Sequence, residues 1–369
     1  ALRVFLDELA AEKRLLDALA TNDELSEVRA VLSWSYRSLE PEAARLFKLL
    51  ADHPGSEISV EAACALSGSS EWHTLRMLDS INEIHLIDRI NSRRYQMHDL
   101  VKAYASERAD AECDPADRAE AVRRMFAWYL ARAYGSYKMI LPQGRPIDIG
   151  SLADSMNAST FRDIDEALAW CDVERSNVLA CVEQAEAVGE FAFAWKLALA
   201  FIGYLERRSY WSAWIESHEI AIRSAGAIGD LSAQSFALML QGDAYWDRRD
   251  FDEALARYTK AIEVSRTARD RWTEGFALRG CSLTHLELGN YQDAVRYSSA
   301  AYSIFVDIGE LRGQGMTLLS LGNAYRELRD FEAATRHYNS AIRIFTQLGN
   351  EWSVGLASYH SGLADTLSS

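Results

Sequence analysis

Three consecutive residues, Met97-His98-Asp99, are the strongest candidates for chemistry in this sequence. A histidine ring can bond to a bound anion, and a carboxylate at a helix start can accept from the first unpaired N–H groups. A helical pattern of apolar residues begins immediately afterwards at Leu100. From the residues alone, Asp99 is therefore predicted to be the helix N-cap, and Met97 is expected to belong to the core.

The other reactive residues point away from catalysis. The chain contains no G-x-S-x-G motif, no H-E-x-x-H motif and no G-x-x-x-x-G-K-[ST] phosphate loop. Its eight histidines lack metal-ligand spacing, and its five cysteines are scattered without a C-x-x-C pair. We therefore expect no catalytic residue, no metal site, no disulfide framework and no ATP hydrolysis by this chain.

The composition predicts a cytoplasmic protein with two or three domains. Of the 369 residues, 49% are hydrophobic and 25% are charged. We find no window close to the ~20 apolar residues of a membrane span, and no secretory signal. The net charge of −15 is spread along the chain without a basic block, so we expect neither direct nucleic-acid binding nor membrane contact. The sequence starts at Ala1 inside an amphipathic pattern, which suggests part of a longer protein.

The stretch before Met97-His98-Asp99 is predicted to form helices and a β-hairpin. Apolar spacing indicates three helices and then two strands, at 40–53, 60–66, 72–81, 86–90 and 94–97. Three helices and a two-stranded wing form a winged helix, whose usual role is to read DNA. The recognition helix predicted here offers Arg76 as its only certain cation, so we reject DNA reading for it.

The second half of the chain repeats itself at a shift of 40 residues. The recurring positions are small, aromatic or turn-forming: Gly242, Ser282, Gly322 and Gly362; Phe251, Tyr291 and Phe331; Asp250, Asn290 and Asp330. A degenerate repeat is expected at Gly189–Ile228, and the chain has no proline after Pro146. Small residues at a fixed phase let paired helices approach closely, which is the layout of tetratricopeptide repeats stretched beyond ~34 residues.

The front third resembles the winged-helix subdomain of NB-ARC (STAND-class) regulatory ATPases of the Streptomyces antibiotic regulatory protein type. The matching stretches are LSWSYRSLEPEAARLFKLLADHPG, AACALSG, HLIDRI and YQMHDLVKAYASERA. Met97-His98-Asp99 is similar to the MHD switch motif of that family, whose histidine reaches the β-phosphate of ADP. The resemblance implies this contact for His98 in the intact protein, where ADP or ATP is the expected cofactor. Because this chain departs from the family in lacking a phosphate loop, we expect no cofactor in it. The segment at 169–185, AWCDVERSNVLACVEQA, is similar to the family's connection between winged helix and repeats.

These patterns predict a mainly α chain. A winged-helix domain with a small β-hairpin is followed by an α-solenoid of 40-residue tetratricopeptide repeats. The expected division is a helical segment at 1–30, a winged helix at 31–110, a helical linker at 111–188 and a repeat sensor domain at 189–369.

The leading hypothesis is a regulatory, non-catalytic fragment of a nucleotide-switch transcriptional regulator. Its repeats would bind a signal ligand, peptide or protein, and its winged helix would control the ADP/ATP state together with NTPase and effector regions N-terminal to Ala1. The repeat phase directs one set of side chains into the groove: Met239, Asp243, Trp246, Asp247, Arg279, Leu283, Leu286, Glu287, Asn323, Arg326 and Glu327. One alternative is a tetratricopeptide adaptor without a nucleotide link, and a third is a phosphatase- or peptidase-like effector.

Overall fold

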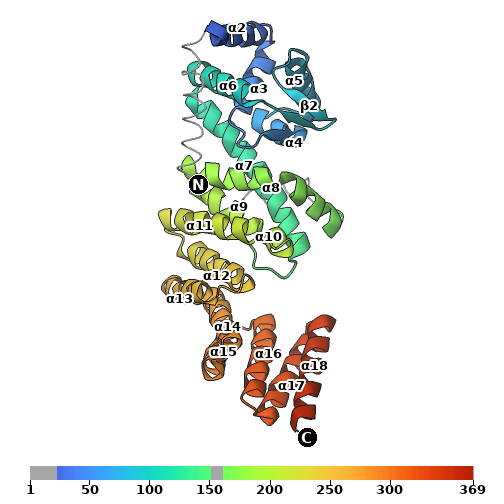
Figure 1. Ribbon diagram of the computed structural model, residues 1–369, viewed down its shortest axis with the longest axis vertical. Coiled ribbons are helices and arrows are strands. Elements are labelled where there is room, and N and C mark those ends of the chain that lie inside the picture. Colours follow the sequence, from blue (N-terminus) through green and yellow to red (C-terminus); the bar gives the residue numbers. More distant parts are fainter. Residues whose placement is uncertain (1–22, 151–160, 369) are drawn as a thin grey trace. The chain divides into compact units, whose positions relative to one another are not determined.

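The computed structural model describes residues 23–150 and 161–368, which are mainly helical (Figure 1). Most of the helical segment expected at 1–30 lies outside the described residues. The chain divides into two compact units, Ala1–Tyr204 and Leu205–Ser369. The finer division into four domains remains a prediction.

The first unit begins with helices and a small sheet in the order that the sequence predicts. The elements are α2 (Asp23–Arg37), α3 (Pro41–Leu50), β1 (Glu57–Ser59), α4 (Val60–Ser67), α5 (Glu71–Glu83), β2 (Asp88–Asn91) and β3 (Arg94–Gln96). The predicted hairpin is present as β2 and β3. In addition, β1 pairs antiparallel with β3, which is therefore the central strand. Sequence reasoning missed β1 because three residues are too few to show an alternating pattern.

Local chemistry sets the boundaries of these short helices. Pro41 stands in the first turn of α3, where its missing N–H leaves no hydrogen bond unmade. The hydroxyls of Ser59 and Ser70 accept from backbone N–H groups in the first turns of α4 and α5. Gly68 then ends α4 in the left-handed conformation, at φ 71°. These caps set where the helices begin and end.

Longer helices complete the first unit. They are α6 (Asp99–Glu112), α7 (Pro115–Ile140), α8 (Ile164–Ala187), α9 (Phe191–Ala200) and the start of α10 (Ile202–Arg207). Helix α7 begins after Asp114, which caps it by accepting from the N–H of Ala116. Because α7 contacts α4, α8 and α9, it joins the part that holds the sheet to the helices that follow (Figure 1).

The second unit is a series of paired helices, and the predicted 40-residue period is confirmed. The helices are α11 (Trp211–Ala227), α12 (Leu231–Asp247), α13 (Phe251–Ala268), α14 (Arg271–Glu287), α15 (Tyr291–Asp307), α16 (Leu311–Glu327), α17 (Phe331–Gln347) and α18 (Glu351–Ser368). The first helices of successive repeats begin at 231, 271, 311 and 351. Each helix contacts the next in sequence, and α12, α14, α16 and α18 also contact one another in order. This is the architecture of a solenoid.

Glycine lets the two helices of a repeat approach closely. A side chain on Gly322 would meet the ring of Tyr338 at 2.4 Å, and the same arrangement recurs at Gly242. In the repeat between them, Ser282 takes the glycine position and Ser298 the tyrosine position, with their hydroxyls 2.5 Å apart. A glycine–tyrosine pair is thus exchanged for two serines, so the same interface is filled in two ways.

Candidate functional site

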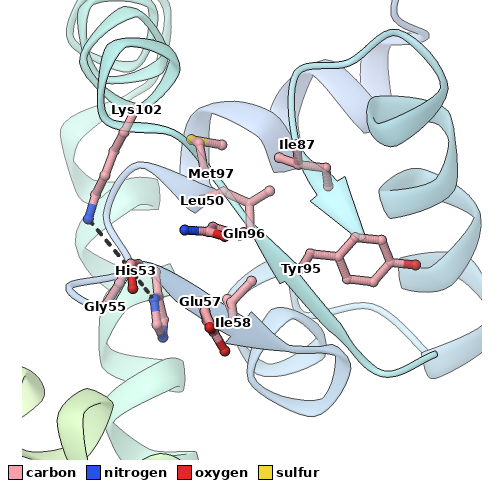
Figure 2. A pocket seen from close by; sticks show the side chains of 11 residues that line it. Leu50, His53, Gly55, Glu57, Ile58, Ile87, Tyr95, Gln96, Met97 and Lys102 are labelled. Atoms are coloured by element: carbon pink, nitrogen blue, oxygen red, sulfur yellow. Dashed lines mark hydrogen bonds between the residues drawn. The ribbon is translucent and has the colours of Figure 1, made fainter. Parts of the chain in front are cut away.

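The segment Met97-His98-Asp99 connects β3 to α6. Met97 is 8% exposed, as predicted, and lines a small pocket together with Leu50 and Ile87 (Figure 2). That pocket has a volume of about 10 Å³, which is too small for more than a water molecule. In contrast, His98 and Asp99 are exposed. The His98 Nε2 atom lies 2.9 Å from a carboxylate oxygen of Asp88 in β2, so the ring is accessible beside the hairpin.

The predicted helix cap is wrong by one residue. Helix α6 begins at Asp99, and His98 holds the N-cap position with an extended backbone, at φ −66° and ψ 146°. The carbonyl of His98 accepts from the N–H of Lys102 at 2.8 Å, as expected for the residue before a helix. Asp99 is therefore an acidic residue of the first turn, where its charge complements the helix dipole.

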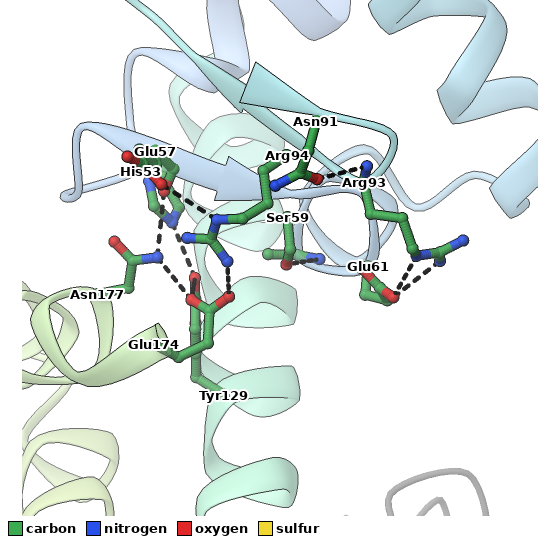
Figure 3. Close-up of polar contacts among 11 residues, drawn as sticks. His53, Glu57, Ser59, Glu61, Asn91, Arg93, Arg94, Tyr129, Glu174 and Asn177 are labelled. Atoms are coloured by element: carbon green, nitrogen blue, oxygen red, sulfur yellow. Dashed lines mark hydrogen bonds and ion pairs between the residues drawn. The ribbon is translucent and has the colours of Figure 1, made fainter. Parts of the chain in front are cut away.

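A buried polar network links β1 and β3 to α7 and α8 (Figure 3). At its centre is Glu174 of α8, whose side chain is 3% exposed. Its carboxylate accepts from Arg94 of β3, from Asn177 Nδ2 at 2.6 Å and from the Tyr129 hydroxyl at 3.3 Å. Asn177 also donates to the carbonyl of Glu57 in β1 at 3.1 Å. One carboxylate thus connects the central strand to both helices.

His53 extends this network into the loop before β1. Its Nε2 atom lies 3.0 Å from the Tyr129 hydroxyl (Figure 3). Its Nδ1 atom lies 3.2 Å from the Gly55 carbonyl. Burial and the nearby charge of Lys102 lower the pKa of His53 to about 3, so the ring is neutral. Gly55 has no room for a side chain, because a Cβ there would lie 1.9 Å from Asn177 Oδ1. The loop is therefore held closely against α8.

Sequence reasoning did not identify this network. Glu174 and Asn177 fall within the stretch AWCDVERSNVLACVEQA, but nothing in that stretch indicates their partners. Arg94 lies 80 positions away from Glu174, and His53 lies 76 positions from Tyr129. Hydrogen bonds between such distant residues leave no periodic signal.

A larger cavity lies next to α6, α7 and α8. Its volume is about 630 Å³, within the range of ligand pockets. The charged side chains on its wall are paired with one another: Arg118 with Asp52 and Asp110, and Arg123 with Glu190. We therefore assign it no charged ligand. Among residues 23–150 and 161–368, no cluster of His, Cys, Asp and Glu is suited to a metal ion.

The predicted groove residues lie on α12, α14 and α16 and differ in exposure. Asp247, Glu287 and Glu327 are exposed. The partly buried members are Asp243, Trp246, Arg279, Leu283, Leu286, Asn323 and Arg326. Met239 is only 4% exposed, so its prediction as a groove residue is wrong. Its methionine side chain is adaptable and apolar, and it fills the space between helices instead.

Asp243 and Asn323 play equivalent roles 80 residues apart. The Tyr258 hydroxyl donates to Asp243 Oδ1 at 2.7 Å, and the Tyr338 hydroxyl donates to Asn323 Oδ1 at 2.8 Å. Burial raises the pKa of Asp243 to about 7, although the hydrogen bond from Tyr258 favours the charged form. Arg279 approaches from α14 and also favours that form. The neutral amide of Asn323 thus accepts the same tyrosine hydrogen bond as the carboxyl group of Asp243, whose charged form is disfavoured by burial.

Replacing Asp243 by asparagine is expected to stabilise the protein above pH 7. Between pH ~4 and ~7 the native state binds a proton that the unfolded chain has already released, so stability falls as pH rises through that window. Asparagine can accept from Tyr258 without this cost, as Asn323 does. Allowing for solvent access, we expect a gain of about 1–2 kcal/mol at pH 8 and almost none at pH 4, measured by urea unfolding. The exposed Asp252→Asn variant serves as control, and an equal change at both pH values would contradict the assignment.

The helix pairs and their glycine contacts give the second unit the fold of tetratricopeptide repeats. The tetratricopeptide repeat family matches residues 234–307 and 282–347. Regulatory protein AfsR of Streptomyces griseus is 29% identical over 312 residues, which is 84% of this chain and 32% of that protein. AfsR of Streptomyces coelicolor is 28% identical over 350 residues, covering 83% of this chain and 35% of its own length. The chain is therefore homologous to AfsR over most of its length, and it spans about a third of these relatives.

Two solved structures align with parts of the chain. A STAND protein with a tetratricopeptide repeat sensor from Pyrococcus horikoshii aligns with a TM-score of 0.38 at 19% identity, covering 89% of this chain and 54% of that chain. BtubC from P. vanneervenii aligns with a TM-score of 0.46 at 14% identity, covering 62% and 92%. As for membranes, none of the helices at 23–150 and 161–368 combines the length and the apolar character that a span needs.

Proposed function

We propose that this chain is the regulatory part of a nucleotide-switch transcriptional regulator in the cytoplasm, without catalytic activity of its own. The observation that carries the proposal is the homology to AfsR over 84% of the chain. The matched stretch is too long to fall within either compact unit alone. It therefore relates both the segment Met97-His98-Asp99 and the repeats to a regulatory protein.

The buried polar network ties the segment that carries His98 to α8. Arg94 stands three residues before Met97, and Glu174 ties it to α8. Asn177 ties β1 to the same helix through the carbonyl of Glu57. A displacement of α8 would therefore move both β1 and β3, and with them the segment that carries His98.

The surroundings of His98 fit a single phosphate contact and not a complete nucleotide site. The exposed imidazole can donate one hydrogen bond to a phosphate oxygen. However, Asp88 lies against the ring, so a phosphate would face a carboxylate unless cations came from elsewhere. The phosphate loop and its lysine must come from the NTPase region of the intact protein. ADP or ATP would then bind there, with His98 as one contact.

Substituting His98 by alanine is expected to weaken ADP binding by the intact protein about tenfold. The estimate is the loss of one charge-assisted hydrogen bond. The measurement is a calorimetric titration of ADP into the full-length protein and its His98→Ala form. His73→Ala, an exposed histidine of α5, is the matched control and should bind ADP like the wild type. Equal affinity of His98→Ala and wild type would disprove the role given to His98.

The groove residues on α12, α14 and α16 suit a peptide or protein partner, or a small signal ligand. They combine an aromatic ring, aliphatic side chains and both charge signs, with Trp246, Leu283 and Arg279 as examples. A tetratricopeptide adaptor without a nucleotide link would bind a partner at the same residues. The two proposals differ in one result, because only the nucleotide switch predicts that a bound partner changes the ADP affinity of the intact protein.

A further inference from the structure

One groove residue departs from the pattern of its repeat position. Arg279 of α14 lies 40 residues after Met239 and 40 residues before Leu319. The same position in the two neighbouring repeats therefore carries an apolar side chain, whereas here it carries a guanidinium group. Since α14 contacts both α12 and α16, this position lies between complete repeats.

The guanidinium group of Arg279 lacks an acceptor. Its Nε atom is shielded from water and has no hydrogen-bond partner among residues 23–150 and 161–368. Asp243 attracts it, but the carboxyl group of Asp243 accepts its hydrogen bond from Tyr258. By contrast, Nη1 of the groove residue Arg326 donates to His360 Nδ1 at 2.9 Å. The sequence thus places at 279 a cation whose hydrogen-bonding capacity the repeats do not use.

A cation of this kind costs stability. Removal from water lowers the pKa of Arg279, and the nearby charge of Arg312 acts in the same direction. Arginine nevertheless stays charged in proteins, so it cannot escape the cost by losing a proton. A methionine or leucine at this position would carry no such cost. Local conflicts of this type persist mainly at functional sites, and we therefore expect a ligand to supply the acceptor.

The acidic residues nearby do not create an equal demand for a cation. Removal from water raises the pKa of Asp243 to about 7, and it raises the pKa of Glu206 and of Asp247 in the same direction. These carboxyl groups can become neutral by taking up a proton when an anion binds beside them. Arg279 has no such route, so the unmet requirement at this position is an acceptor.

Trp246 of α12 is a second groove donor without an acceptor. Its indole Nε1 atom is also shielded from water and has no partner in the described part of the chain. Trp246 corresponds to Leu286 of the next repeat, seven positions after Arg279. The two donors are therefore about two turns apart along the helices and one helix apart across them, which is roughly 14 Å. An extended peptide covers this distance with about four residues.

We propose that Arg279 binds a carboxylate of an extended peptide segment, and that a backbone carbonyl of the same segment accepts from Trp246. A guanidinium group can hold a carboxylate through two parallel hydrogen bonds. The carboxylate belongs either to an aspartate or glutamate side chain or to the carboxyl terminus of the peptide. This inference rests on the proposed partner binding by the groove residues, and it narrows the partner to an acidic peptide.

Selection of the 1–369 chain against two random heptapeptide libraries tests the proposal. One library displays free carboxyl termini, and the other is fused to its carrier at that end. Enrichment of Asp or Glu from the fused library would identify a side-chain carboxylate. Binders found only in the free library, and lost on amidation, would identify the terminal one. Either result supports a carboxylate ligand.

Fluorescence polarisation of the leading peptide then assigns the contact. Arg279→Met should weaken its binding at least about tenfold, because a charge-assisted hydrogen bond is lost. Arg296→Met removes an exposed arginine of α15 and should bind the peptide like the wild type. Asp243→Asn should strengthen binding about threefold at pH 8, because a competing carboxylate is removed.

Thermal melting separates this contact from a structural role. Arg279→Met introduces the residue of the preceding repeat in place of an unmatched charge, so its melting temperature should rise by about 2–4 °C while binding is lost. Neutral peptides that the wild type and Arg279→Met bind alike would overturn the role of Arg279 and leave the groove residues as a partner site. Selection of no peptide by the wild type would overturn the peptide site itself.

Discussion

Replacing Glu174 by alanine is expected to lower the free energy of unfolding of the first unit by about 3–5 kcal/mol. The change leaves the Arg94 guanidinium, whose side chain is only 13% exposed, without its buried carboxylate partner. It also removes the acceptor of Asn177 Nδ2 and of the Tyr129 hydroxyl. Each of these groups keeps one other contact, Arg94 with the half-exposed Glu57 carboxylate, Asn177 with the Glu57 carbonyl and Tyr129 with His53. The loss of a partner inside a buried site nevertheless costs more than the bond itself contributed. Urea unfolding followed by tryptophan fluorescence measures the loss.

A matched control comes from an exposed ion pair of the same sheet region. Glu61 accepts from Arg93, and both side chains are more than 40% exposed. Glu61→Ala should cost less than about 1 kcal/mol, because water screens the pair and replaces the lost bond. A similar loss in Glu174→Ala and Glu61→Ala would contradict the description of Glu174 as the centre of a buried network.

Converting the Gly322–Tyr338 pair into two serines is expected to show strong coupling between the two positions. Gly322→Ser alone forces a side chain against the ring at 2.4 Å, which should cost about 1–3 kcal/mol. Tyr338→Ser alone leaves a cavity and removes the hydrogen bond to Asn323, at a cost of about 3–5 kcal/mol. The double variant recreates the Ser282–Ser298 pair, so it should be more stable than the sum of the single costs by about 1–2 kcal/mol.

Urea unfolding of the wild type, both single variants and the double variant gives the coupling energy directly. The neighbouring Asn339→Ser change lies on the exposed side of α17 and should stay within about 0.5 kcal/mol of wild type. Additive costs would mean that the glycine and the ring do not share one packing site. The Gly322–Tyr338 and Ser282–Ser298 pairs would then not be alternative ways to pack the same interface.

Part of the site could be read from the residues alone. Met97 was predicted to belong to the core and is buried. The next residue in the sequence, His98, is exposed. The exact helix start could not be read, because the backbone angles of His98, and not the capping preference of Asp99, decide where α6 begins. The contact of His98 with a nucleotide remains a prediction.

The repeat architecture was determined by the sequence itself. Asp250, Asn290 and Asp330 mark the turns, and α13, α15 and α17 begin at the residue after each of them. Turn residues and small residues at a fixed phase are local signals, and each repeat contacts mainly its neighbours. A periodic sequence therefore specifies a periodic fold.

Only the tertiary structure decided which distant side chains meet. Glu174, Arg94 and His53 come from separate stretches whose patterns are equally consistent with exposed polar residues, and packing of α7 and α8 against the sheet buries them together. Met239 is buried although its phase predicts a groove position, because neighbouring helices cover it. Which residues are buried depends on how the helices and strands pack together, and the sequence of a single helix or strand does not determine it.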